Sequence, residues 1–302
     1  MITIKEEHTW VPGSGAAIKD FELQKAPIAA IIIRQVALNE TDATTLTEDL
    51  TQFATLMYIK DGGTRITPEW SATEFYQYHS AFFGRVPPSF IGTKANNTMN
   101  FIRMVMPLGR PQVMSHASFL PSIVDPLVGL NPKGTPYLVL SVPADAANDN
   151  REYKIAVVYK HRPFRYTKRW TDWASQTLST TSYKSWVIGD KGLWLELFGF
   201  QTTEEHTHPA SDVPTILTVN AERGGKDVLF DGDVTNPLTA LQPQHVGLVT
   251  HGLLDDQYMY MTLSQAPFDN FDMCVRLSQE TKFRVKGGAA DAAKFAFSVL
   301  TK

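Results

Sequence analysis

A pattern that occurs twice along the chain limits the possible fold more than any other feature. Each copy contains an apolar run, a polar loop, a second apolar segment and a pair of glycines. The copies extend from Ile28 to Ile66 and from Gly192 to Phe230, with Gly62-Gly63 and Gly224-Gly225 at equivalent places. A repeat of this kind predicts two similar structural units. We therefore expect an ancient duplication, with the two copies built on one plan.

The joint between the copies is a short basic and aromatic connector that contains a proline. A chain of 302 residues is long enough for two units of roughly 150 residues, each with its own core. We therefore predict an N-terminal domain over residues 1–160 and a C-terminal domain over residues 161–302, with the connector at residues 160–173.

Most of the pattern indicates β-strands. Residues 101 to 106 alternate in character with a period of two, and Leu193, Leu195 and Leu197 share one face of another predicted strand. The segment from Ile28 to Ile33 is apolar on both faces, so we expect other parts of the protein to cover it on both sides. Short, numerous strands separated by Gly, Pro and Asn predict an all-β protein built as a sandwich or a barrel.

One short helix is predicted within the first half. Ser71 and Glu74 have the spacing of a capping box, in which each side chain binds the backbone amide of the other residue. Trp70 and Phe75 occupy the two positions of a hydrophobic staple, and Gly84 can end the helix in the left-handed conformation. We expect this helix to pack over a β-sandwich.

A proline-rich excursion between Gly109 and Thr135 has no counterpart in the second half. Prolines remove donors from a β-ladder, so the segment is predicted to be an ordered loop and no central strand. Its apolar side chains would form a larger exposed patch than soluble monomers usually carry. We therefore predict that it contacts other subunits through Val113, Met114, Phe119, Leu120, Ile123 and Leu127.

The connector carries five cations interleaved with aromatic residues: Lys160, Arg162, Arg165, Lys168 and Arg169. Such a sequence can bind nucleic acid or lipid, because cations contact phosphates and aromatic rings stack on bases. It can equally form a basic edge that faces the carboxylates of a partner subunit. Since the chain has a formal net charge of -3, we favour the partner subunit and expect no direct contact with a genome.

The one arrangement that resembles a metal site is the pair His206 and His208. Two histidines at i and i+2 on a strand point to one face and could both reach a metal ion. They are similar to the His-x-His pair of bicupins, but the glutamate and glycine-framed motif of those enzymes are absent. Pro209 also follows the pair directly, so we expect a solvated loop, no metal and no cofactor.

Several other classes of protein are not favoured by the sequence. The single cysteine, Cys274, cannot form an internal disulfide, and we expect an inert thiol. The first residues lack the basic and apolar regions of a signal peptide, and no apolar run approaches the roughly 20 residues that cross a bilayer. No phosphate loop, dinucleotide fingerprint or nucleophile elbow is present. We therefore expect no enzyme.

The duplicated run and the similar way in which each half closes resemble the double jelly-roll major capsid proteins of tailless icosahedral viruses. This family includes coat proteins of membrane-containing phages, adenovirus-like viruses and archaeal viruses. The three closing segments are Phe101 to Leu108, Tyr137 to Val142 and Tyr153 to Lys160 in the first half, and Tyr258 to Ser264, Phe271 to Ser278 and Phe295 to Lys302 in the second.

The resemblance implies an all-β fold of two tandem eight-stranded jelly-roll β-sandwiches with a short helix and loop excursions. It also implies a structural coat protein that forms a homotrimer of pseudo-hexagonal outline and tiles an icosahedral capsid. Its partners would be other copies of itself and neighbouring capsomers, with minor capsid, vertex or membrane proteins as further candidates. The place of action would be the virion, after assembly in the host cytoplasm.

Two other classes of function stay open from the sequence. One is a bicupin-type metal-dependent enzyme whose first half has lost its metal. The other is a two-domain β-sandwich module that binds carbohydrate through exposed tryptophans, for which Trp170, Trp173, Trp186 and Trp194 are the candidates.

Overall fold

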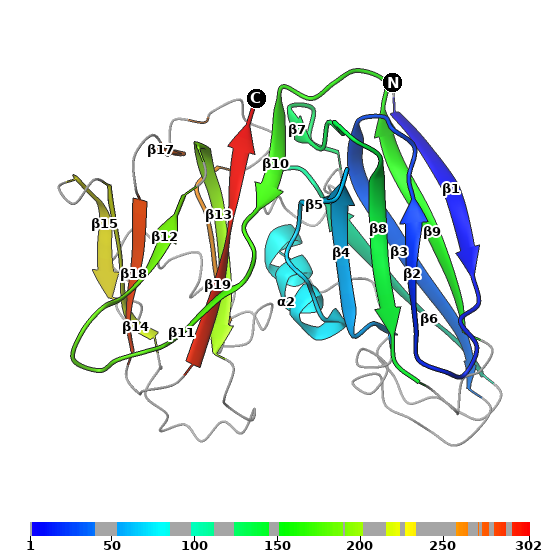
Figure 1. Cartoon of the computed structure of the whole chain (residues 1–302), viewed down its shortest axis with the longest axis horizontal. Helices are drawn as coiled ribbons and strands as arrows, with labels where there is room; N and C mark the ends of the chain where they lie inside the picture. The colour runs from blue at the N-terminus through cyan, green and yellow to red at the C-terminus, as the bar shows by residue number, and fades with distance from the viewer. Residues whose placement is uncertain are drawn as a thin grey trace. The chain divides into compact units, whose positions relative to one another are not determined.

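The structure is a computed structural model of the whole chain (Figure 1). It describes residues 2–39, 53–84, 98–111, 124–144, 151–189, 191–201, 216–223, 227–233, 258–264, 271, 274–277, 281–287 and 292–302. Within these ranges almost every regular element is a β-strand, as the alternating sequence pattern predicts.

The chain divides into two compact units, Met1–Lys168 and Arg169–Lys302. The division lies within strand β10 (Tyr166–Trp170), so this strand belongs partly to each unit. The predicted boundary at residues 160 and 161 therefore lies just before this strand, and the assignment of two domains at that boundary stays a prediction.

The first unit contains two antiparallel four-stranded sheets, with the strand orders β1-β9-β3-β6 and β2-β8-β4-β5. The strands of the first sheet are β1 (Ile2–Trp10), β9 (Glu152–Lys160), β3 (Ile28–Asn39) and β6 (Thr98–Pro107). Those of the second are β2 (Ala17–Glu22), β8 (Pro136–Val142), β4 (Leu56–Asp61) and β5 (Thr64–Arg65). The turn between β4 and β5 uses Gly62 and Gly63, with φ of 55° and 91°, values that favour glycine.

Alternation along the strands buries one face of each sheet in the core of the first unit. On the first sheet Ile31, Ile33 and Ile155 are fully buried, and on the second sheet Met57 and Leu138 are. These side chains lie at every second position, which places them on the same side of the pleat. The core of the first unit is thus formed by the inner faces of its two sheets.

The expectation that the segment Ile28 to Ile33 is covered on both sides is confirmed over most of its length. Ile31 and Ile33 face the core, while Ala30 lies on the opposite face and is also fully buried. On that opposite face Ala30 packs with Val158 and with the ring of Phe164 from the connector. Ile32, further along the strand, is only half-buried.

The predicted helix is present as α2 (Ala72–Phe83) and begins as the sequence indicates. The backbone amide of Glu74 donates to Ser71 Oγ at 3.2 Å, and the amide of Ser71 donates to Glu74 Oε2 at 2.9 Å. At the other end Gly84 has a φ of 61° and closes the helix in the left-handed conformation. The rings of Trp70 and Phe75 meet edge to face at 6.0 Å, as a hydrophobic staple requires.

The second unit contains an antiparallel sheet with the strand order β12-β18-β14-β15. A second group of strands gathers around β13, which pairs with β16, β17 and β19, and β11 pairs with β19. The strands of the unit are β11 (Ala174–Thr177), β12 (Lys184–Ile188), β13 (Gly192–Gln201), β14 (Ile216–Arg223), β15 (Asp227–Asp233), β16 (Tyr258–Thr262), β17 (Val275–Leu277), β18 (Thr281–Gly287) and β19 (Ala292–Thr301).

Aromatic side chains fill the core of the second unit. Trp186, Trp194, Phe283, Phe295 and Phe297 belong to one buried cluster, in which neighbouring rings meet at centroid distances such as 4.9 Å between Trp186 and Phe295. Edge-to-face contacts of this kind add stabilisation beyond simple burial. Trp170 is buried as well and Trp173 is half-buried, so none of the four tryptophans proposed for carbohydrate binding is exposed.

Among the described residues no helix is both long enough and apolar enough to cross a bilayer.

Candidate functional site

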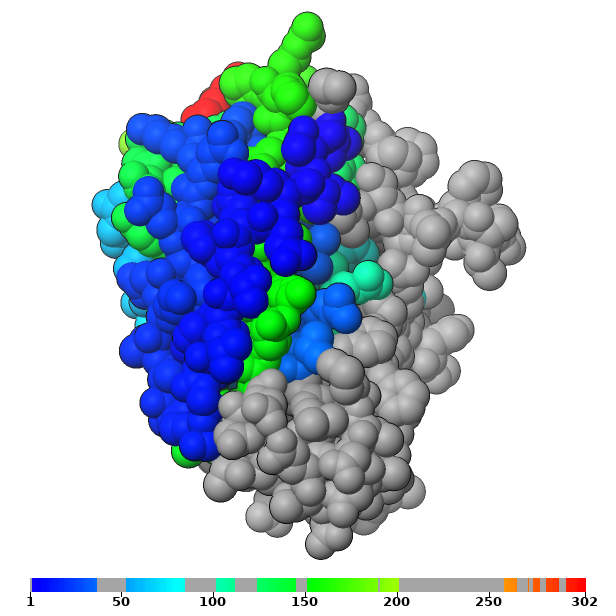
Figure 2. Space-filling view, turned by 90° about the vertical axis from the view of Figure 1, so that its right-hand side faces the viewer, coloured from blue at the N-terminus to red at the C-terminus, as the bar shows by residue number. Residues whose placement is uncertain are grey.

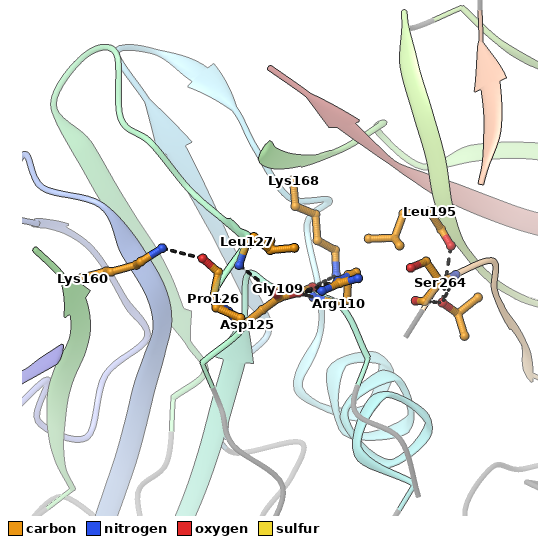
Figure 3. Close-up of polar contacts among 10 residues, drawn as sticks. Gly109, Arg110, Asp125, Pro126, Leu127, Lys160, Lys168, Leu195 and Ser264 are labelled. Carbon is orange, nitrogen blue, oxygen red and sulfur yellow. Dashed lines mark hydrogen bonds and ion pairs between the residues drawn. The ribbon is translucent and has the colours of Figure 1, made fainter. Parts of the chain in front are cut away.

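The excursion is the part of the chain for which the sequence predicts contact with other subunits. Of its six predicted contact residues, Leu127 is described and is half-buried. The other five, Val113, Met114, Phe119, Leu120 and Ile123, lie outside the described residues. The structure does describe where the excursion leaves the first unit and returns to it. We call this place the excursion base: Gly109, Arg110, Asp125, Pro126 and Leu127 (Figure 3).

A buried ion pair joins the two ends of the excursion base. The Arg110 guanidinium donates from Nε to Asp125 Oδ2 at 2.8 Å and from Nη2 to Oδ1 at 3.2 Å, and both side chains are fully buried. The same carboxylate accepts the backbone amides of Arg110 at 3.0 Å and of Leu127 at 2.9 Å. Four donors therefore converge on one carboxylate, which compensates for much of the cost of burying its charge.

The chain is packed tightly where the excursion leaves the sandwich. A Cβ atom on Gly109 would lie 2.6 Å from the Cβ of Asp125, closer than two carbon atoms can approach without rearrangement. A Cβ on Gly129, in the short strand β7 (Val128–Gly129), would lie 2.4 Å from Cε2 of Phe164. Both glycines are therefore required by close approach, one within the base and the other beneath the connector.

A buried lysine from the connector holds the start of the excursion. Lys168 is 1% exposed, and its ammonium donates to the carbonyl of Gly109 at 3.1 Å and to the hydroxyl of Tyr78 at 2.9 Å. The ammonium also lies 5.6 Å and 5.0 Å from the ring centroids of Tyr78 and Phe82 on helix α2. These contacts place the connector, the helix and the excursion base against one another within the first unit (Figure 3).

The other end of the connector holds the end of the excursion. Lys160 donates from Nζ to the carbonyl of Pro126 and lies 4.5 Å from the centroid of the Phe164 ring. Asn131 accepts the amide of Phe164 at 2.8 Å and donates to its carbonyl at 3.0 Å. Tyr166 donates its amide to Leu127 O at 3.0 Å, which begins the parallel pairing of β10 with β7.

The five connector cations thus fall into two groups. Lys168 is buried and Lys160 is half-buried, and both bind carbonyl groups within the first unit. Arg162, Arg165 and Arg169 are exposed. The expectation that connector cations face a partner can therefore apply to these three arginines, whereas the two lysines have a structural role.

The sequence interpretation did not single out Arg110, Asp125 or Asn131. One available signal was the isolated ionic residues at the two ends of an otherwise apolar and proline-rich segment. Arg110 precedes Pro111, and Asp125 precedes Pro126. Because an apolar segment does not bury a single charge without compensation, two opposite charges at its ends favour a pair.

The contacts of the excursion base fix the two ends of the excursion to the first unit. Within the described residues no group of three or more His, Cys, Asp or Glu side chains is positioned to hold a metal ion. His206 and His208 lie outside those residues. Cys274 is a buried free thiol.

Comparison with solved structures gives full-length matches at very low sequence identity. The major capsid protein of Sulfolobus turreted icosahedral virus matches with a TM-score of 0.61 and 9% identity, over 99% of this chain and 96% of that chain. The major capsid protein P2 of bacteriophage PM2 matches with a TM-score of 0.59 and 8% identity, over 99% of this chain and 97% of that chain. No protein-family model and no curated protein matches the sequence.

The chain has the double jelly-roll fold. The fold predicted from the duplicated sequence pattern is therefore confirmed, including the all-β class and the resemblance to the double jelly-roll major capsid proteins. At identities of 8–9% this likeness concerns the fold, and it extends over both units of the chain.

Proposed function

We propose that the chain is a structural coat protein whose homotrimers form pseudo-hexagonal capsomers of an icosahedral viral shell. The observation that carries the proposal is the near-complete mutual coverage with major capsid proteins, 99% of this chain and 96–97% of theirs. The matched structures contain essentially this architecture from end to end. The described part of the chain therefore needs no domain beyond those that the matched capsid proteins also have.

The proposed trimer follows from the geometry of duplicated units. A closed ring of identical chains needs a heterologous interface, in which two different surfaces of neighbouring copies meet. Two similar but non-identical units in each chain supply six such units around a ring of three. The apolar excursion residues, among them Phe119 and Ile123, are the proposed contact material.

The excursion base supports this assignment. Its buried Arg110–Asp125 pair and the Lys168 contact fix both ends of the segment to the first unit. A segment that carries an intersubunit contact benefits from anchored ends, because less conformational entropy is then lost when a partner binds. The partners we propose are other copies of the chain and neighbouring capsomers, with minor capsid, vertex or membrane proteins as further candidates. The proposed location is the virion capsid, after assembly in the host cytoplasm.

Light scattering on the purified protein tests the proposal. We expect a mass three times that of the 33.7 kDa chain at micromolar concentration, and we expect the variant Phe119→Asp/Ile123→Asp to lose this mass while its circular dichroism is kept. A folded, soluble wild-type monomer would contradict the trimer. Bound Fe, Mn, Zn or Ni at about one per chain that disappears in His206→Ala/His208→Ala would instead favour the bicupin-type enzyme.

A further inference from the structure

Four loops of the first unit lie together at one end of its sandwich. We call this end the connector end. It consists of the β2–β3 turn (residues 23–27), the β4–β5 turn (62–63), the β7–β8 loop (130–135) and the first part of the connector (161–165). Figure 1 shows the connector, strand β7 and the start of β1 at this end of the unit. In Figure 2 the connector, in green, projects from the top of the same unit.

Hydrogen bonds hold these loops against one another. The amide of Lys160, where β9 meets the connector, donates to Pro27 O in the β2–β3 turn at 2.9 Å. Asp61, at the end of β4, accepts the amide of Gly134 in the β7–β8 loop at 2.7 Å. The bonds of Asn131 described above join that loop to the connector. The four loops therefore form one surface, although they are far apart along the chain.

The connector end is rich in exposed cations. Lys25 comes from the β2–β3 turn, Lys133 from the β7–β8 loop, and Arg162 and Arg165 from the connector, and all four are exposed. Within the part of the chain that the structure describes, the side chains of Lys25, Lys133 and Arg162 make no hydrogen bond or ion pair. Arg165 lies 5.3 Å from the centroid of the Tyr166 ring. Contacts within the first unit therefore do not account for this group of charges.

The acids near the connector end offset only part of this charge. Asp61 is half-buried, and its two carboxylate oxygens accept backbone amides of the β7–β8 loop. Glu22, the last residue of β2, is exposed. Glu6 is also exposed, but it lies four residues beyond Ile2 on β1, about 13 Å further from this end. The connector end is thus positively charged, whereas the chain has a formal net charge of -3.

The composition of the connector end favours a lipid surface over a nucleic acid. Phe164, Tyr166 and Trp170, the aromatic residues of the connector, are buried and cannot stack on bases. An aliphatic side chain is exposed there instead, because Ile2 pairs with Lys160 at the end of β9 and is 50% exposed. Binding to an anionic bilayer combines electrostatic attraction with the burial of apolar side chains. Both components are present at this end.

We propose that the connector end of the first unit binds an anionic lipid bilayer through Lys25, Lys133, Arg162 and Arg165. The sequence favours a partner subunit for the connector arginines, but the structure groups two of them with cations from distant loops. This inference rests on the proposed function, because a cyclic trimer brings three connector ends to the same side of the capsomer. Three linked sites on one bilayer bind far more tightly than one.

Cosedimentation of the purified trimer with lipid vesicles tests the inference. The wild type should sediment with phosphatidylglycerol vesicles and stay in solution with phosphatidylcholine vesicles. The binding should be present in about 0.1 M NaCl, where the screening length is about 10 Å, and lost in about 1 M NaCl, where it is about 3 Å. Binding that is equal for the two lipids would overturn the inference, because the headgroup charge would then play no part.

Two double variants remove charge from different loops of the connector end. Arg162→Glu/Arg165→Glu and Lys25→Glu/Lys133→Glu should each lower the partition into phosphatidylglycerol vesicles at least tenfold. The reason is that each basic residue near an anionic bilayer increases binding by roughly fivefold. Circular dichroism, melting temperature and light scattering show whether each variant is folded and trimeric. If a variant does not fold, the corresponding Gln variant replaces it, and the same direction of change is expected.

The matched control is Arg34→Glu/Arg103→Glu. It changes the net charge by the same amount, also at exposed positions of the first unit. Arg34 lies six residues beyond Ile28 on β3, about 20 Å from the connector end, and Arg103 lies directly opposite Arg34 on β6. At that distance the charges are largely screened from a bilayer at the connector end. The control should therefore keep the wild-type partition within about twofold.

The outcomes separate this inference from the proposed function. A monomeric wild type contradicts the proposed function itself. A trimeric wild type that does not sediment with phosphatidylglycerol vesicles overturns only the present inference. An equal loss in the control also overturns it, because net charge would then be the cause. So does a connector-end variant that is folded but no longer trimeric, because its cations would then belong to a subunit contact. If the wild type binds DNA but not the vesicles, and the connector-end variants lose the DNA, the partner is a nucleic acid and the inference fails.

Discussion

Removing the charge of Asp125 should destabilise the first unit far more than removing an exposed carboxylate. The variant Asp125→Asn keeps the shape of the side chain but places an amide donor against the Arg110 guanidinium. Since both side chains are fully buried, the arginine charge would be left without its counter-ion. Breaking a buried pair on one side costs about 3–5 kcal/mol. We expect a loss of that size in the free energy of unfolding.

The matched control is the exposed pair between Arg65 and Glu69. Its N–O distance is 2.7 Å, and its side chains are 37% and 43% exposed. Because solvent screens such a pair, Glu69→Gln should cost less than about 1 kcal/mol. Urea unfolding followed by circular dichroism measures both variants under the same conditions.

A double variant separates the ion pair from general damage at the site. Arg110→Met/Asp125→Asn removes the uncompensated charge while the asparagine can still accept a backbone amide. It should therefore be more stable than Asp125→Asn alone, since an apolar replacement of a buried pair is often close to neutral. If Asp125→Asn and Glu69→Gln shift the urea midpoint equally, or the double variant is the least stable, the pair does not hold the excursion base as described.

Two further predictions concern the core and the pH dependence of the first unit. Ile31→Ala or Ile33→Ala should lower the unfolding free energy by about 2–5 kcal/mol, because each leaves a cavity among fully buried side chains. The control Ile18→Ala, at a position 66% exposed, should change it by less than about 0.5 kcal/mol. An unchanged urea midpoint for both core variants would contradict the burial of Ile31 and Ile33. The pKa of Tyr159 is raised above its ordinary value, first by burial and then by its hydrogen bond to Glu7. A raised pKa in the folded state stabilises the protein fully below the unfolded pKa of about 10, and this contribution is lost as the pH rises further. Melting temperatures should therefore fall more steeply above about pH 10 in the wild type than in Tyr159→Phe, and equal slopes would count against the Tyr159 explanation.

The sequence predicts the parts of this fold that depend on local patterns. The capping box of Ser71 and Glu74 specifies the start of helix α2, because the two residues need only each other. The apolar run from Ile28 marks the central strand β3, because burial on both faces removes the usual alternation. The duplication predicts the architecture, because two copies of one sequence pattern are expected to form two similar structural units.

Other parts of the fold cannot be predicted from local sequence patterns, because they depend on strands that are far away along the chain. Strands β1 and β2 are rich in charged residues, and they form only through pairing with β9 and β8. In the second apolar segment of the first copy, strand β4 begins at Leu56, where pairing with β8 starts.

In the candidate site, too, local features can be predicted from the sequence and long-range contacts cannot. The excursion stands out by its prolines and apolar residues, which are local features. The residues that hold its ends cannot be recognised in the sequence, because they are far apart along the chain. Arg110 is 15 residues from Asp125, and Lys168 is 59 residues from Gly109. A lysine in a basic connector would ordinarily be assigned to the surface, yet Lys168 lies between aromatic rings of helix α2.

The way the excursion is fastened has a consequence for evolution and for engineering. Its two ends are held by contacts that lie in the base and within the first unit. Lengthening a closed loop is inexpensive, about 0.6 kcal/mol for each doubling. We therefore expect the first unit to keep its fold when a peptide is inserted there. Variation in this segment should therefore act on the proposed contact with other subunits and leave the fold of the first unit in place.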